Sequence, residues 1–454
     1  MSNFSVGYAQ VNINPKLGIG ISGYYILRVA KGFLDDLQAS CLALSLKGNT
    51  VLMMNVDHLG LQNAVSEQYR RQIAEATGVP FENLFLTATH THTAPLADTE
   101  LFIYGDEQDI YEYADFLGAR LVDAAKLAIA DLKPGKMGYC TGYAPERVAY
   151  IRRYRMKDGS TMTCPPIDDP NIVAPIGTLD QQVHVLRFDQ ENGGSIVLVN
   201  YGVHCDTIGG ELVSADFPAW LRCTLDKALD GVKCMFFPGA QGDVGSTNVH
   251  PIGGDMNDTE ISFDNEMKSP GMARFVGRAL AGTVLQVYDK VTYVDVDKLT
   301  ALQKIVKIPS NMPKPEDMPL AHKYKELHEA GKDDEIPFEA MELTTVVAEA
   351  LRMCTLEHGP EFFALPMAGI QIGPVALLGL PGEPFTDVGV GIKKAPGWDL
   401  ILPCGLTNGY MGYFPVKAAF DEGGYEARTS RYKAGVAELL VDEAQALLSE
   451  LQNS

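Results

Sequence analysis

The sequence lacks the features that mark several common classes of protein. No apolar run approaches the roughly 18 residues that cross a bilayer, and the strongest runs, 195–199 and 375–380, have the length of a strand. We therefore expect no integral association with a membrane. The amino terminus has no basic segment followed by an apolar one, so it does not resemble a signal peptide, and we expect a cytoplasmic protein.

Positive charge and paired cysteines are also scarce. The chain has 37 Lys and Arg residues against 58 Asp and Glu residues, a formal net charge of −21 at pH 7. A field of this sign repels phosphate backbones, so nucleic acid is not an expected partner. The eight cysteines are scattered and form no C-x-x-C pair, which favours reduced thiols over disulfides or a zinc ribbon.

The common catalytic motifs are missing as well. The sequence contains no Walker A motif, no G-x-S-x-G nucleophile elbow and no H-E-x-x-H, which argues against P-loop enzymes, serine hydrolases and zincins. Residues 18–23 match G-x-G-x-x-G, but they follow a proline-broken segment and open no clear helix. A dinucleotide site is therefore not expected there.

What is present is the pattern of a mixed α/β protein, in which short apolar runs alternate with longer amphipathic stretches. We predict strands over 51–56, 84–89, 183–188, 195–200, 234–237, 364–372 and 375–380. We predict helices over 65–76, 108–132, 217–229, 271–288, 338–356 and 431–451. Two helix starts carry a capping side chain ahead of a proline, Asp216 before Pro218 and Ser269 before Pro270.

The expected fold is a mixed β-sheet core flanked by helices, with the active site in loops at the strand ends. We treat residues 1–454 as a single catalytic domain. The stretch 308–335, with its prolines and charges, is interpreted as either an exposed excursion from it or a weak domain boundary. Two polar stretches without periodicity, 157–178 and 239–262, are predicted to form walls of the site.

Side chains of the type that bind metals follow the predicted strands directly. The five segments are Asp57-His58, 90–93 with its two histidines, 204–206, 238–245 and 381–384. In α/β sheets, ligands bind outside the carboxyl ends of the strands, so these loops are predicted to meet in one crevice.

Imidazole and carboxylate are the usual ligands of catalytic zinc, and His90, His204 and Glu383 supply such a set. His90 and His92 lie on the same face if the chain is still extended, so one can bind metal while the other reaches the substrate. Five other histidines are interpreted as structural: His58, His184, His322, His328 and His358. The glycine-rich segment 239–245 is either a tight turn or part of the site.

Taken together, the motifs resemble the neutral/alkaline ceramidase family over about residues 5 to 440. The resemblance is carried by Ala88-Thr89-His90-Thr91-His92-Thr93-Ala94-Pro95, Asn200-Tyr201-Gly202-Val203-His204, Gly239-Ala240-Gln241-Gly242-Asp243-Val244, Pro381-Gly382-Glu383, Met411-Gly412-Tyr413 and Tyr425-Glu426. Members of this family are zinc amidases that cleave an N-acyl bond with a metal-activated water.

The resemblance implies one Zn²⁺ per chain, held by His90, His204, Glu383 and Tyr413. It also implies catalytic contacts to the scissile amide. The expected catalytic residues are His92, Arg152, Tyr425 and Asp243, with Gln241, Gly245 and Ser246 expected to bind substrate. Either Arg152 or Arg153 can fill the arginine position, because Ile151 stands where the family has Asn, and we favour Arg152.

Two departures from the family bear on the substrate. The chain ends soon after the last motif, so the family's C-terminal β-sandwich domain is not expected, and Gly245-Ser246 stands where the family has a serine followed by proline. We therefore expect an N-acylated small molecule or lipid-like substrate, without specifying ceramide.

Two alternatives to the amidase remain. The first is a two-metal phosphoesterase built from Asp57, His58, His90, His92, Asp206, His204 and Asp243. The second is a catalytically inactive homologue that only binds a ligand.

Overall fold

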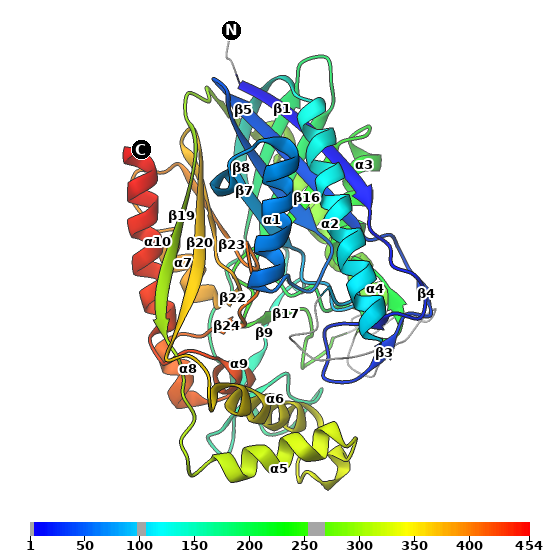
Figure 1. The fold of residues 1–454 in the computed structure, drawn as a ribbon, viewed down its shortest axis with the longest axis vertical. Helices are drawn as coiled ribbons and strands as arrows, with labels where there is room; N and C mark the ends of the chain where they lie inside the picture. Colours follow the sequence, from blue (N-terminus) through cyan, green and yellow to red (C-terminus); the bar gives the residue numbers. More distant parts are fainter. Residues whose placement is uncertain (1–3, 98–105, 253–267) are drawn as a thin grey trace.

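The computed structural model describes residues 4–97, 106–252 and 268–454. Two β-sheets pack face to face, and helices cover the outer face of each sheet (Figure 1). This arrangement confirms the predicted α/β class with a mixed sheet core flanked by helices. The second sheet was not anticipated from the sequence.

The larger sheet has the order β16-β14-β13-β8-β1-β5-β6-β7, with β18 paired to β8. Its strands are β1 (Phe4–Asn12), β5 (Gln38–Leu46), β6 (Asn49–Val56), β7 (Leu84–Ala88), β8 (Lys133–Tyr143), β13 (Gln182–Gln190), β14 (Ser195–Tyr201), β16 (Lys233–Pro238) and β18 (Thr292–Val294). The pairs β6–β7 and β14–β16 are parallel, and the others are antiparallel. Each parallel pair therefore places two carboxyl ends at the same edge.

The smaller sheet consists of β19 (Leu299–Pro309), β20 (Phe362–Ile372), β21 (Val375–Gly379) and β23 (Leu400–Cys404). Apolar side chains from the facing surfaces of the two sheets form one buried cluster, which includes Phe85, Phe237, Leu377 and Leu402. Because β21 of this sheet and β14 of the larger one are buried on both faces, their sequences read as nearly continuous apolar runs. This explains why β21 and β14 could be recognised in the sequence.

Four helices cover the larger sheet: α1 (Asn63–Thr77), α2 (Glu107–Ala130), α3 (Phe217–Ala228) and α4 (Pro270–Val287). The outer face of the smaller sheet is covered by α7 (Thr386–Ile392) and α10 (Val436–Asn453). Both predicted helix caps form, since Asp216 accepts a hydrogen bond from the Phe217 amide and Ser269 accepts one from Met272. None of the described helices is long and apolar enough to cross a membrane.

The predicted excursion leads into a helical hairpin, α5 (Met318–Glu329) and α6 (Ala340–Leu356). It lies at one end of the molecule in Figure 1, where α6 packs against α9 (Tyr425–Thr429). The short elements are β2 (Gly20–Ile21), β3 (Arg28–Val29), β4 (Gly32–Phe33), η1 (Phe81–Asn83), β9 (Tyr150–Ile151), β10 (Arg153–Met156), β11 (Thr161–Thr163), β12 (Ile172–Pro175), β15 (Leu212–Val213), β17 (Val244–Gly245), η2 (Tyr288–Lys290), η3 (Asp333–Glu335), β22 (Glu383–Pro384), β24 (Tyr413–Phe414) and α8 (Lys417–Glu422).

Candidate active site

The loops that follow β7, β14, β16 and β21 meet at one end of the two sheets. They bring the ring centroids of His90 and His204 to 4.8 Å from each other, and Glu383 lies beside both rings. The loop after β16 approaches this site closely because it contains Gly242. A Cβ atom at this position would lie 2.5 Å from the Glu383 carbonyl oxygen. The close packing of this loop against Glu383 therefore requires glycine at position 242.

Both imidazole rings are oriented by backbone carbonyls. His90 places Nδ1 2.6 Å from the Leu59 carbonyl oxygen, and His204 places Nδ1 2.8 Å from the Gln241 carbonyl oxygen. A carbonyl can only accept, so Nδ1 carries the proton in each ring and Nε2 keeps its lone pair, to which Arg152 donates in the case of His204. This is the tautomer in which Nε2 can bind a metal.

The two Nε2 atoms face the same carboxylate oxygen. Glu383 Oε2 lies 3.3 Å from Nε2 of His90 and 2.9 Å from Nε2 of His204, and all three side chains are almost fully buried. Three acceptor atoms that converge in a buried space require a proton or a cation between them. The residues therefore fit a metal ion.

The electrostatics of the metal-free cluster agree with this reading. Burial alone would raise the pKa of Glu383, but the adjacent imidazoles of His90 and His204 hold it well below its usual value. Burial would lower the pKa of His90, yet the Glu383 carboxylate raises it overall. In His204, burial and the nearby Arg152 guanidinium keep the pKa low. The carboxylate thus favours positive charge at this point.

A third imidazole completes the cluster. His90, His92 and His204 can each offer a nitrogen such that all three atoms lie within 4.8 Å of one another, which fits a metal site. Tyr413 lies opposite Glu383 in the short parallel pairing of β22 with β24. Tyr410, which the sequence analysis missed, donates its hydroxyl to Glu383 Oε1 at 3.0 Å. Its position three residues before Tyr413 is the only clue in the sequence.

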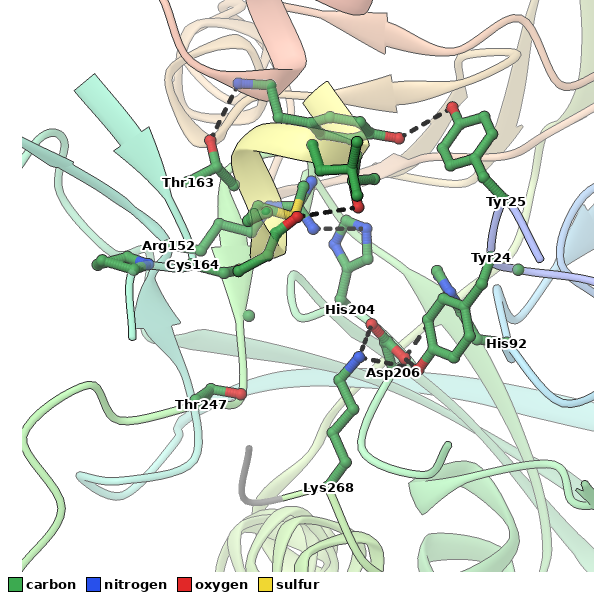
Figure 2. A pocket seen from close by; sticks show the side chains of 18 of the residues that line it. Tyr24, Tyr25, His92, Arg152, Thr163, Cys164, His204, Asp206, Thr247 and Lys268 are labelled. Atoms are coloured by element: carbon green, nitrogen blue, oxygen red, sulfur yellow. Dashed lines mark hydrogen bonds and ion pairs between the residues drawn. The ribbon is translucent and has the colours of Figure 1, made fainter. Parts of the chain in front are cut away.

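A cavity of about 430 Å³ opens beside this cluster. Seven of the predicted site residues line it: His92, Arg152, His204, Gly245, Ser246, Tyr413 and Tyr425. Figure 2 shows His92 and His204 pointing into the same space as Arg152. The outer wall comes partly from α6, through Leu343 and Val347, and from Ile167 and Val249. The predicted wall segment 157–178 does contribute; residues 253–262 of the other one lie outside the described residues.

Of the two neighbouring arginines, Arg152 is the one that lines the cavity. Its guanidinium donates to Glu426 Oε1 at 2.6 Å, to the Gly242 carbonyl at 2.8 Å and to His204 Nε2 at 3.1 Å. Arg153 is buried elsewhere, where it binds Glu422 and the Gly423 carbonyl. The alternation of side chains along an extended segment places the two residues on opposite faces.

Tyr425 begins the short helix α9, and its hydroxyl lies 3.1 Å from that of Tyr25. The next residue, Glu426, is fully buried and holds Arg152 with one carboxylate oxygen while Thr163 donates to the other at 2.7 Å. Glu426 was part of the recognised motif but had no predicted role. The structure shows that it orients the arginine.

Four predicted site residues do not line the cavity. His90 and Glu383 belong to the buried cluster beside it, whereas Asp243 and Gln241 lie in the loop after β16. The Asp243 carboxylate instead accepts hydrogen bonds from the backbone and hydroxyl of Thr386, at 2.8 and 2.9 Å, and burial raises its pKa to about 6. Gln241 is buried, and its backbone carbonyl orients His204. Both residues lie in the loop after β16, where Gln241 contacts His204 and Asp243 contacts Thr386, and neither lines the cavity.

Two of the additional groups of the two-metal alternative, Asp57 and His58, are likewise engaged elsewhere, whereas Asp206 lines the cavity. Asp57 forms a buried bidentate pair with Arg222, at 2.9 and 2.7 Å. His58 turns Nδ1 toward Gly60, and burial lowers its pKa to about 4. Among the described residues, the three-histidine group is the one cluster of metal-ligand type. The packing therefore leaves Asp57 and His58 out of the site.

Comparison with known proteins gives a structural likeness without a sequence match. No protein-family model matches the chain, and no curated relative matches its sequence. The structure of neutral ceramidase from Pseudomonas aeruginosa is similar with a TM-score of 0.70 and 19% identity, covering 99% of this chain and 75% of that chain. A ceramidase complexed with C2 is similar with a TM-score of 0.71 and 19% identity, covering 99% and 76%. The chain thus has a neutral ceramidase-like fold.

Proposed function

We propose that the protein is a zinc-dependent amidase that hydrolyses the amide bond of an N-acylated small molecule or lipid-like compound. The observation that carries the proposal is the buried meeting of two Nε2 lone pairs with the Glu383 carboxylate. The likeness to ceramidases supports the same conclusion, because those proteins act on an N-acyl amide.

The proposed site holds one Zn²⁺ through His90, His204, Glu383 and Tyr413. Nitrogen and carboxylate ligands of this kind favour zinc over calcium or magnesium. When bound, zinc polarises the amide carbonyl and lowers the pKa of water to about 7, which makes a nucleophile available at neutral pH. The Leu59 and Gln241 carbonyls serve by holding the two imidazoles in the required tautomer.

The remaining side chains act on the substrate. Arg152 and Tyr425 are proposed to donate hydrogen bonds to the carbonyl oxygen as it becomes negative, each contributing on the order of 3 kcal/mol. His92 is proposed to take a proton from the attacking water and to deliver it to the leaving amine. Its pKa is well below the usual value because the ring is buried, so the neutral form needed for a base prevails.

The shape of the cavity supports a substrate with an apolar part. Leu343, Val347, Ile167 and Val249 surround its outer portion, whereas charged and hydroxyl groups gather near His92. An acyl or alkyl chain fits the apolar wall while the amide lies against the polar groups. Ceramide and shorter N-acyl amines are the compounds of this class to test first.

The test combines metal analysis with a substrate panel. The purified protein should contain about one zinc per chain, and a chelator should abolish hydrolysis of N-acyl amines that differ in chain length and head group. Zinc should restore the activity. Two metals per chain together with phosphoester cleavage would support the phosphoesterase instead. A metal-loaded protein that binds these amides without cleaving them would be the inactive homologue.

A further inference from the structure

His92 has an unusual environment for a ring that must handle protons. Its side chain is only 12% exposed, and both ring nitrogens are buried without a hydrogen-bond partner among the described residues. A neutral imidazole carries one N–H, and a buried donor left unpaired is costly. Some neighbouring group is therefore expected to accept this hydrogen in the working enzyme.

The nearest charged acceptor is Asp206. Its Oδ1 atom lies 3.7 Å from Nδ1 of His92, longer than a hydrogen bond but close enough for a small ring rotation to close the gap. Catalytic hydrogen bonds are often long in structures without substrate. The backbone fixes this proximity, because the His92 amide donates to the Cys205 carbonyl at 3.3 Å and Asp206 is the next residue.

Asp206 is itself held in place by two donors. Tyr24 donates its hydroxyl to Oδ1 at 2.6 Å, and Lys268 donates to Oδ2 at 2.9 Å (Figure 2). Lys268 also donates to the Tyr24 hydroxyl at 2.8 Å. These two donors orient the carboxylate at the cavity wall.

We propose that Asp206 is a positioning residue that accepts the Nδ1–H of His92 and thereby points the Nε2 lone pair at the reacting atoms. This inference rests on the proposed amidase function. Nε2 takes a proton from water as the new C–O bond forms, and returns it to the amine nitrogen as the C–N bond breaks. The Nδ1 proton stays between His92 and Asp206, so water and amide give acid and amine with no net proton change.

A double-mutant cycle tests this dependence. Asp206→Asn and His92→Ala should each lower kcat by about 10²–10⁴-fold, and the double variant should be no slower than His92→Ala alone. Asp180→Asn is the matched control, because Asp180 and Lys393 form a pair of similar exposure that does not line the cavity. It should leave kcat within about twofold of the wild type. Losses that multiply in the double variant would overturn the proposal.

Nitrogen NMR of histidine-labelled, zinc-loaded protein gives a second readout that needs no turnover. The His92 ring signals, assigned by their loss in His92→Ala, should show protonation at Nδ1 in the wild type and change in Asp206→Asn. Ring signals that are identical in the two proteins would refute the proposal. If wild-type protein lacked zinc or amidase activity, the proposed function would fail, and the same NMR comparison on that protein would still decide the His92–Asp206 contact.

Removing the carboxylate leaves Lys268 without its charged partner, so a second variant is needed in case Asp206→Asn does not fold. Tyr24→Phe then takes its place, because it removes only one donor to Asp206. We expect a loss of kcat of about tenfold that disappears in the His92→Ala background. A tenfold loss that persists in that background would contradict an action through His92.

Discussion

Gly23 lies against His92 so closely that a single methyl group should displace the ring. A Cβ atom at position 23 would lie 2.7 Å from the His92 Cβ and 2.8 Å from its Cα. Ordinary contact begins at 3.4 Å, so the two segments must separate by about 0.7 Å. His92 is meanwhile held by Arg28, which donates to its carbonyl at 2.7 Å.

Two effects should follow from Gly23→Ala. Alanine at φ +111° is strained by about 1–2 kcal/mol, and the crowding adds a further 1–3 kcal/mol to the loss in free energy of unfolding. A catalytic group misplaced by about 1 Å can cost up to about 10²-fold in rate. We therefore expect a 10- to 10²-fold lower kcat with unchanged zinc content.

Gly18→Ala is the matched control. Gly18 also has a left-handed backbone, at φ +91°, but a Cβ atom there would have no neighbour within 4 Å. Denaturant unfolding should show the backbone strain in both variants, whereas only Gly23→Ala should lose turnover. Equal kcat in the two variants would show that the position of His92 does not limit the reaction.

Three further changes probe other parts of the site. Ser246→Ala should keep substantial activity, because the proposed nucleophile is water; an acyl-enzyme trapped on Ser246 would contradict this. Glu383→Ala should weaken zinc binding at least tenfold, measured by competition with a chelator, and full zinc affinity would remove Glu383 from the ligand set. Asp57→Asn should cost about 3–5 kcal/mol of unfolding free energy because Arg222 is left buried and unpaired. The folded fraction of that variant should still bind zinc, and its loss would reinstate Asp57 as a ligand.

Much of the fold could be read from the sequence, although unevenly. The predicted strands 51–56, 195–200 and 375–380 were recognisable because both of their faces are buried. The strand β8 was not, since its sequence contains glycines and polar residues and its strand conformation depends on nine residues of pairing with β13. Such pairing partners are far apart in the chain, and local composition does not report them.

The roles of the individual site residues were also only partly predictable from the sequence. The sequence alone predicted a metal site, because His90 and His204 follow apolar strands and the pair His90 and His92 has little reason to be there for packing. It could not separate the two aspartates. Asp243 turns toward Thr386 and Asp206 toward His92, and this depends on which loop packs against each. The sequence determines which residue types are available. The distances between their side chains, on which their roles depend, are set only when the two sheets pack and bring the loops together.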